Sequence, residues 1–107
     1  MGKFKLDQTG SQWHFNLLAG NNEVILTSQM YGSKAGAENG IESVRDNAQR
    51  NGALQIKEAK NGQDYFVLSA ANGQVIGTSQ MYTSLQACEN GMASVVRNAP
   101  NAELIDA

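Results

Sequence analysis

Cysteine, proline and histidine are almost missing from this chain, which has 107 residues and one of each. One cysteine, Cys88, cannot form a disulfide within the chain, so thiol usage gives no support for an oxidising compartment. The sequence also has no cluster of Cys, His, Asp and Glu with the spacing of metal ligands. Neither a Walker A loop nor a G-x-G-x-x-G fingerprint occurs. We therefore expect no metal and no other cofactor.

An excess of charge of one sign is missing too, and so are long hydrophobic runs. The net charge is -2, and the eight basic residues are scattered along the chain. Nucleic-acid and anionic membrane surfaces usually need clustered Lys and Arg, so we expect neither partner. No apolar run approaches the roughly 20 residues of a membrane helix, and MGKFKLDQTG lacks the apolar core of a signal peptide. These features predict a cytoplasmic protein.

An internal repeat is the most prominent feature that is present. The five letters TSQMY occur at residues 27–31 and again at 78–82. When residues 13–48 are aligned with 64–99, at a shift of 51, 19 of the 36 pairs are identical. We interpret the chain as a duplication within one globular domain, 1–107, with repeat 1 at 1–52 and repeat 2 at 53–107.

Period-two alternation predicts three antiparallel strands at the start of each repeat. Phe4 and Leu6 alternate with polar residues, and so do Trp13, Phe15 and Leu17. A third strand is expected at 23–27 in repeat 1 and at 74–78 in repeat 2. The second of these follows Asn72-Gly73, a strong signal for a two-residue hairpin turn.

The period then changes to about 3.6, which predicts one helix in each repeat. Ser33 and Ser84 are placed to cap the two helices. Pro100 should push Ala99 out of the α region and end the second helix near Asn98, and by correspondence the first should end near Asn47. The predicted apolar stripes are Ala37, Ile41, Val44 and Ala48 in the first helix, and Cys88, Met92, Val95 and Ala99 in the second.

Each helix is followed by a short apolar segment, 51–54 or 101–104, that predicts a closing strand. The fold class is therefore α+β, built from two tandem β3-α-β repeats. A single unit of about fifty residues would bury little surface and leave a sheet edge open. We expect the two units to form one antiparallel-rich sheet with pseudo-two-fold symmetry and both helices on one face.

These motifs resemble the YegP-like family of small bacterial proteins. The resemblance rests on TSQMY leading into a helix that carries Glu-Asn-Gly, at 38–40 and again at 89–91, and it covers nearly the whole chain. It implies that the C-terminal strand of each unit is exchanged onto the other, and it implies no biochemical activity. Two local departures are Gly77 in the place of Leu26 and Leu85 in the place of Lys34.

The repeated TSQMY corner has two interpretations. In the structural one, Met30 fills a gap under the strand-to-helix corner and Tyr31 packs its ring there with its hydroxyl in water. In the functional one, Gln29 and Tyr31, with Gln80 and Tyr82, offer donors, acceptors and aromatic surface to a ligand. A corner that must be built twice explains the repetition without a ligand, so the structural interpretation is the simpler.

Glycine within a helix costs about 1 kcal/mol relative to alanine, yet both helices contain one, Gly40 and Gly91. We expect these glycines to allow close approach of the helix to the sheet or to the other helix. Each helix also carries a polar row, interpreted either as solvated surface or as a face that binds a partner. The rows are Asn39, Ser43 and Asn47 in the first helix, and Asn90, Ser94 and Asn98 in the second.

The search for catalytic residues is mostly negative. His14 lies on a predicted strand and corresponds to Tyr65, so no histidine-based triad is repeated. Cys88 falls on an apolar stripe, which is typical of a buried, inert thiol. We predict no enzyme.

The favoured hypothesis is a monomeric binding or interaction module with two equivalent faces and an unknown protein or small-molecule partner. Its candidate ligand-binding residues are Gln29, Tyr31, Asn39, Gln80, Tyr82 and Asn90. The alternative is a small enzyme that uses Tyr31, Glu38 or His14.

Overall fold

Alternating apolar residues, serine caps and glycine turns produce seven strands, two α-helices and one short 3₁₀ helix in the computed structural model, which describes residues 2–106. In chain order the elements are β1 (Lys3–Thr9), β2 (Gln12–Leu18), β3 (Val24–Ser28), α1 (Lys34–Asn47), β4 (Leu54–Glu58), β5 (Asp64–Ser69), β6 (Val75–Thr78), α2 (Leu85–Asn98), η1 (Ala99–Asn101) and β7 (Glu103–Asp106).

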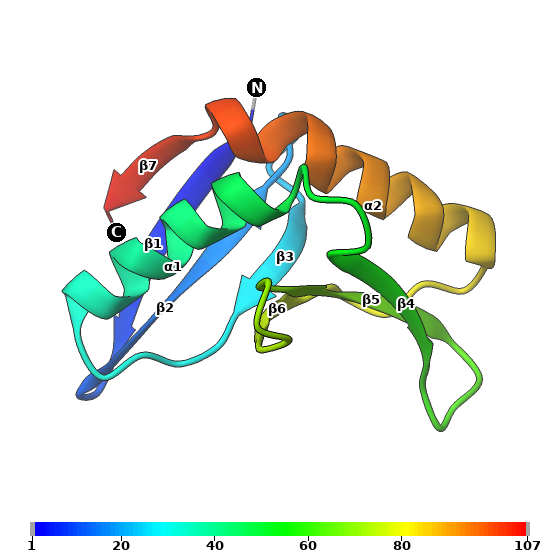
Figure 1. Cartoon of the computed structure of the whole chain (residues 1–107), viewed down its shortest axis with the longest axis horizontal. Coiled ribbons are helices and arrows are strands. Elements are labelled where there is room, and N and C mark those ends of the chain that lie inside the picture. Colours follow the sequence, from blue (N-terminus) through cyan, green and yellow to red (C-terminus); the bar gives the residue numbers. More distant parts are fainter. Residues whose placement is uncertain (1, 107) are drawn as a thin grey trace.

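All seven strands form one mixed sheet in the order β4-β5-β6-β3-β2-β1-β7 (Figure 1). Five neighbouring pairs are antiparallel and one, β1 with β7, is parallel. The first three strands and β4, β5 and β6 therefore make two groups that meet where β3 pairs with β6. The predicted α+β class with a single sheet is confirmed.

The centre of the sheet pairs two residues from the TSQMY motifs, Thr27 with Thr78. Leu26, next to this pair, is fully buried. A Cβ atom on Gly77, which pairs with Ser28, would lie 2.9 Å from Cγ of Leu26, so the large side chain of Leu26 leaves space only for glycine at position 77. This contact explains why the sequence departs from its internal correspondence at Gly77.

A single strand, β4, lies between α1 and β5. The segment 51–54, expected to be a closing strand, reaches the sheet only at Leu54, the first residue of β4. The strand β7 lies at the opposite edge, beside β1, with Phe4 paired to Leu104 (Figure 1). The first and last strands of the chain are therefore neighbours.

The loop between β5 and β6 is longer than the predicted two-residue turn. The N–H of Ala70 donates to the carbonyl of Gln74 and the N–H of Gly73 donates to the carbonyl of Ala70, so residues 71–73 form the turn. Gly73 has a φ of 88°, and in the β2–β3 loop Asn22 has a φ of 68° at the corresponding position. Asparagine tolerates this left-handed region better than most residues.

Both helices start and end where the sequence predicts, but the reason given for the end of α2 is wrong. The hydroxyls of Ser33 and Ser84 accept hydrogen bonds from the N–H groups of Gly36 and Ala87. Ala99, with φ of -58° and ψ of -44°, stays in the α region before Pro100. Proline has no N–H to continue the ladder.

A side chain from the first half of the chain bonds a carbonyl near the end of α2. The amide Nε2 of Gln49 donates to the carbonyl oxygen of Val96 at 2.8 Å. In an α-helix this carbonyl would accept from residue 100, which is proline here. The Gln49 amide therefore satisfies the acceptor and joins the C-terminal ends of the two helices.

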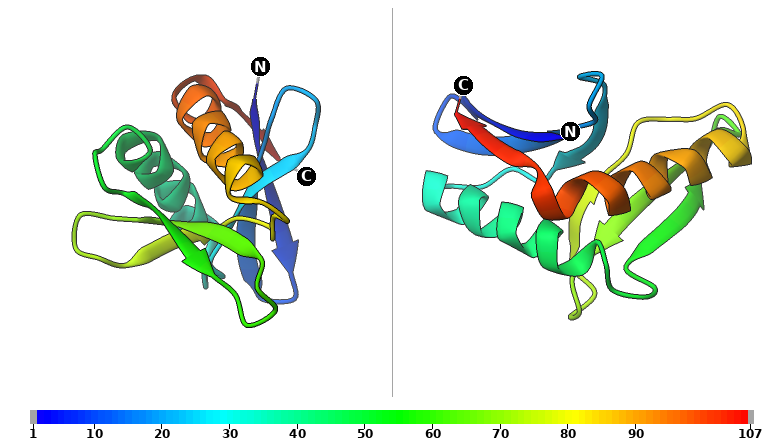
Figure 2. Two further views of the ribbon diagram at one scale, coloured as in Figure 1. Left: turned by 90° about the vertical axis from the view of Figure 1, so that its right-hand side faces the viewer. Right: turned by 90° about the horizontal axis from the view of Figure 1, so that it is seen from above.

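Both α-helices lie on the same side of the sheet (Figure 2). The core residues come from the helices and from the strands that they cover. The predicted alternation is confirmed, because Phe4, Leu6, Phe15 and Leu17 are fully buried. All four residues of the first predicted apolar stripe are buried, and the second stripe is buried except for the partly exposed Met92. No helix within residues 2–106 is long and apolar enough to cross a membrane.

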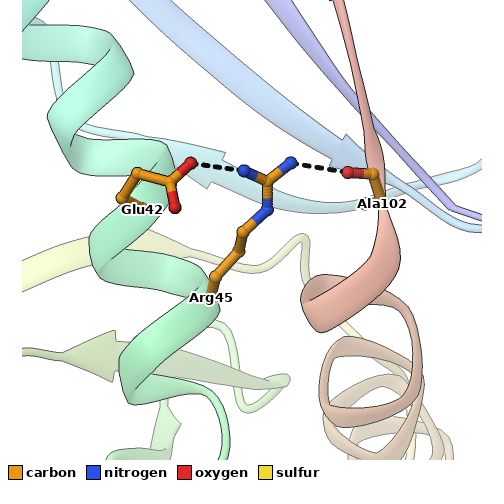
Figure 3. Close-up of polar contacts among 3 residues, drawn as sticks. All are labelled: Glu42, Arg45 and Ala102. Carbon is orange, nitrogen blue, oxygen red and sulfur yellow. Dashed lines mark hydrogen bonds and ion pairs between the residues drawn. The ribbon is translucent and has the colours of Figure 1, made fainter.

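Arg45 holds α1 against the start of β7 (Figure 3). Its Nη2 donates to the carbonyl oxygen of Ala102 at 2.7 Å, and its Nη1 forms an ion pair with Glu42. The guanidinium carbon lies 5.2 Å from the centre of the Phe4 ring. The residue of α2 that corresponds to Arg45 is Val96, so the contact made by Arg45 stabilises only β7, the strand that pairs with β1.

Candidate functional site

Each TSQMY corner is fixed to its own half of the sheet by backbone hydrogen bonds. Tyr31 exchanges two such bonds with Trp13, of 2.7 and 2.8 Å, and Tyr82 exchanges two with Asp64, of 2.7 and 3.0 Å. The hydroxyl of Ser28 accepts from the N–H of Phe15 and donates to the carbonyl of Gln29, and Ser79 makes the same two bonds with Phe66 and Gln80. The serine in the motif therefore has a structural role.

The prediction that Met30 fills a gap under the corner is wrong. Met30 is 46% exposed and its counterpart Met81 is 47% exposed. The space under each corner is filled by tyrosine instead. The Tyr31 ring stacks on Phe15 with 6.1 Å between ring centres, and the Tyr82 ring stacks on Phe66 at 6.2 Å.

Close approach to these tyrosines accounts for the glycines inside the helices. A Cβ atom at Gly40 would lie 2.3 Å from the hydroxyl oxygen of Tyr31, and one at Gly91 would lie 2.3 Å from that of Tyr82. The expectation of close approach holds, although the approaching group is a tyrosine side chain and not the other helix. The Tyr31 hydroxyl therefore lies against the helix and is not simply in water.

A groove of about 630 Å³ opens beside Tyr31, and we call it the first groove. The corner and α1 supply one side, and the loop between β5 and β6 with the start of β6 supplies the other. Predicted residues Gln29, Tyr31 and Asn39 lie together in its lining. The full lining is Gln29, Met30, Tyr31, Gly36, Asn39, Gly40, Ser43, Ala70, Gln74, Val75 and Ile76.

A second groove, of about 260 Å³, opens beside Tyr82. It is formed by the second corner and α2 on one side and by the loop between β2 and β3 with β3 on the other. Predicted residues Gln80, Tyr82 and Asn90 lie together here. The full lining is Ala19, Asn21, Glu23, Ile25, Gln80, Tyr82, Ala87, Asn90, Gly91 and Ser94.

A third depression, of about 240 Å³, lies between the two motifs and is lined by Thr27, Ser28, Gln29, Thr78, Ser79 and Gln80. Gln29 also lines the first groove, and Gln80 also lines the second. The two glutamines therefore connect this central depression with the groove on either side. A fourth depression, away from the motifs, is lined by Lys3, Lys5, Leu18, Asn22 and Ile105.

The polar rows of the helices are exposed at their first residue and partly or fully buried further along. Asn39 and Asn90 are exposed and line the grooves. Asn47 instead donates to the backbone carbonyl and hydroxyl of Ser43, and Asn98 does the same to Ser94. The rows are therefore not plain solvated surface along their whole length, and binding of a partner by them stays a prediction.

Burial raises the pKa of the Tyr31 phenol above its ordinary value of 10.0. Burial is also the largest cause of the raised pKa of Tyr82; a hydrogen bond with the Gln80 side chain opposes it, and the charges of Cys88 and Glu23 add to it. Both phenols are consequently neutral donors near neutral pH. Cys88 is fully buried, which raises the pKa of its thiol, so the predicted burial of this residue is confirmed.

The residues of the enzyme alternative do not line one common depression among the four described above. Tyr31 lines the first groove, whereas Glu38 and His14 line none of the four depressions described above. His14 pairs with Asp7 across β1 and β2, and its buried Nδ1 has no hydrogen-bond partner among residues 2–106. Within residues 2–106, no three His, Cys, Asp or Glu side chains are grouped so that they could hold a metal ion.

Sequence reasoning missed the strand side of each groove. Gln74, Val75 and Ile76 complete the first groove from the second half of the chain, and Glu23 and Ile25 complete the second groove from the first half. The available signal was their correspondence at the same shift of 51 residues that relates the motifs. That correspondence does not reveal that each segment lies opposite the other half's helix.

Comparison with known proteins assigns the chain to a family. The sequence model of a domain of unknown function, DUF1508, matches residues 9–52 and again 59–106. The chain belongs to the DUF1508 family. The UPF0339 protein PA0329 of Pseudomonas aeruginosa is 52% identical over 105 residues, which are 97% of this chain and 96% of that protein.

Two solved structures have the same fold. The solution NMR structure of the UPF0339 protein SO3888 from Shewanella oneidensis has a TM-score of 0.92 at 47% identity, covering 98% of this chain and 90% of that one. The solution NMR structure of YegP from E. coli, described as a protein of unknown function, has a TM-score of 0.91 at 47% identity over 98% and 91%. The resemblance to YegP-like proteins is confirmed, and these DUF1508 relatives carry no named activity.

Proposed function

We propose that this DUF1508 protein is a non-enzymatic binding module whose two grooves each take a small ligand or a short peptide. One observation carries the proposal. Gln29, Tyr31 and Asn39 line one groove, and the corresponding residues Gln80, Tyr82 and Asn90 line a second groove. Each groove is formed by a TSQMY corner, a helix and a strand with the loop before it. Concave sites with a few converging polar groups on an apolar wall are typical of ligand binding.

The chemistry of the first groove favours a neutral ligand with hydrogen-bonding groups. Gln29 and Asn39 supply amides, Ser43 supplies a hydroxyl, and the wall opposite contains Val75 and Ile76. Amide side chains both donate and accept hydrogen bonds, which suits the peptide group. A short peptide would place its backbone against these amides and an apolar side chain against the wall.

Catalysis receives no comparable support. The raised pKa of Tyr31 keeps its phenol protonated near neutral pH, so little phenolate is present to act as a base. Glu38 is exposed on α1, and His14 lies on β2 outside the groove that contains Tyr31. An enzyme would need such groups within reach of one bound substrate.

We further propose that the two halves arose by duplication and are related by an approximate two-fold axis near the Thr27–Thr78 pair. The duplicate hydrogen bonds of Ser28 and Ser79 and the two matches to the family support this. In this view β7 belongs to the second repeat and is exchanged onto the first. Because one chain supplies both copies, we expect a monomer, which light scattering on the purified protein tests.

A screen by amide NMR tests the binding proposal. Uniformly ¹⁵N-labelled protein is titrated with neutral tripeptides and small amides, and the expected result is shifts of the Asn39 and Gly40 signals, of the Asn90 and Gly91 signals, or of both. Asn39→Ala should weaken binding in the first groove alone, and Asn90→Ala in the second alone. Alanine favours the helix, so both variants should fold and each is the control of the other.

Two results would contradict the proposal. One is a screen in which no compound shifts the signals of either groove. The other is binding that survives in both single variants and in the double variant, because Asn39 and Asn90 would then have no part in it.

A further inference from the structure

The two grooves share one construction but differ in charge. Among the described residues that line the two grooves, Glu23 alone is charged. Its counterpart in the first groove is Gln74, an uncharged amide with nearly the same shape. The second groove therefore carries a negative charge that the first lacks, although the side chains at the two corresponding positions have nearly the same size.

The backbone around Glu23 and Gln74 is matched. The N–H of Glu23 donates to Oδ1 of Asn21 at 3.1 Å, and the N–H of Gln74 donates to Oδ1 of Asn72 at 3.0 Å. The carboxylate of Glu23 is further held at Oε1 by the Asn21 amide, at 3.1 Å. The carboxylate is thus kept in a defined position at the strand side of the second groove, opposite Tyr82 and Asn90.

The grooves differ in size as well. Ala87 stands in the second groove where the first has Gly36, and Met30 lines the first groove while Met81 is not part of the lining of the second. The volume of the second groove is about 260 Å³, and that of the first groove is about 630 Å³. The second groove is therefore suited to a smaller ligand than the first.

We infer that the two grooves have diverged in specificity, so that the second binds a small organic cation, such as a primary ammonium group on a short apolar chain, and the first prefers a neutral ligand. This inference rests on the proposed binding function. The ammonium group donates to the Glu23 carboxylate, and Asn90 and Ser94 offer further acceptors. The chain of the ligand packs on Ile25 and Ala19.

The probes for the test are n-butylammonium and its neutral counterpart n-butanol, titrated separately at pH 7 and low salt into ¹⁵N-labelled protein. The Asn90 and Gly91 signals report on the second groove, and the Asn39 and Gly40 signals on the first. Glu23 is exposed, so the attraction has the strength of a surface ion pair. We expect n-butylammonium to bind the second groove about two- to five-fold more tightly than n-butanol, with no such preference in the first groove.

Matched variants are obtained by exchanging the residues at positions 23 and 74. Glu23→Gln should remove the preference for n-butylammonium in the second groove, and Gln74→Glu should create one in the first. Each substitution introduces the side chain that the corresponding position already carries, so the fold should be retained. The double exchange should move the preference from one groove to the other.

The outcomes separate this inference from the proposal on which it rests. An equal preference in both grooves, an unchanged preference in Glu23→Gln, or no shift by either probe would overturn the divergence of the grooves. The tripeptide screen decides the binding function by itself, because it uses neutral ligands that do not depend on Glu23.

Discussion

The Tyr31 hydroxyl lies so close to Gly40 that a methyl group on this helix residue would be 2.3 Å from the phenol oxygen and 2.7 Å from the ring carbon that carries it. The ring cannot move away easily, because it stacks on Phe15. The second half repeats this relationship between Tyr82 and Gly91. The corner, the helix and the sheet are therefore held together by one aromatic side chain in each half.

Gly40→Ala should destabilise the protein, although alanine at an ordinary helix position would stabilise it by about 1 kcal/mol. Overpacking against Tyr31 should cost about 1–3 kcal/mol, measured by urea unfolding followed through Trp13 fluorescence. Gly36→Ala is the control in the same helix, because Ala87 fills the corresponding position in α2. A stable Gly40→Ala protein would show that the tyrosine does not pack as described.

Loss of the Arg45 side chain should loosen β7. Arg45→Met leaves the buried Ala102 without the donor to its carbonyl, at a cost of about 1–3 kcal/mol. Hydrogen exchange should accelerate at the amide of Glu103, which bonds the carbonyl of Gly2. Glu42→Gln removes only the exposed partner of the ion pair and should cost less than about 1 kcal/mol. Equal effects of the two variants would contradict the assigned role of the Ala102 contact.

The tyrosines should make stability fall at high pH. Burial raises the pKa of Tyr31 and Tyr82 in the folded state above the ordinary value of 10.0, so above that pH the folded protein holds more protons than the unfolded chain. The free energy of unfolding must then decrease as pH rises through the ordinary value and beyond, while well below pH 10 both states hold these protons and the two groups have no such effect. Urea unfolding at pH 8 and pH 11 should show a smaller decrease in the Tyr31→Phe, Tyr82→Phe double variant than in the parent protein.

Leu26 and Gly77 should be exchangeable as a pair but not singly. Leu26→Gly removes a fully buried side chain, which should cost about 2–5 kcal/mol. Gly77→Leu forces a second large side chain against Leu26 and should also destabilise. If the halves are related by a two-fold axis, the double variant places one leucine near that axis again. Thermal unfolding should then show it to be more stable than either single variant, and simple addition of the two losses would speak against the axis.

Local patterns were enough to predict most elements of this fold, although the closing strand expected at 51–54 is not a separate strand and contributes only Leu54, the first residue of β4. Alternation around Phe4 and Phe15 and the serines before each helix depend on interactions within a few residues, and the structure has them as expected. The end of α2 was placed correctly for a wrong reason, since Ala99 remains helical and Gln49, distant in sequence, satisfies the Val96 carbonyl.

The grooves were only half predictable for the same physical reason. The six predicted residues came from motifs that recur in the sequence, and the structure gathers them in two sets of three. Exposure of Met30 and the position of Glu23 opposite α2 depend on how the halves pack against each other. Periodicity and turn signals carry no information about such contacts between distant segments.

The parallel pairing of β1 with β7 has a consequence for synthesis on the ribosome. Residues 3–6 leave the ribosome well before their partners, residues 103–106, which follow 100 positions later in the sequence. The outer side of β1 must therefore stay unpaired, or be shielded by other means, while the residues between them are translated. A nascent chain arrested before residue 103 should expose this strand to chaperones, and emergence of residues 103–106 should end that exposure.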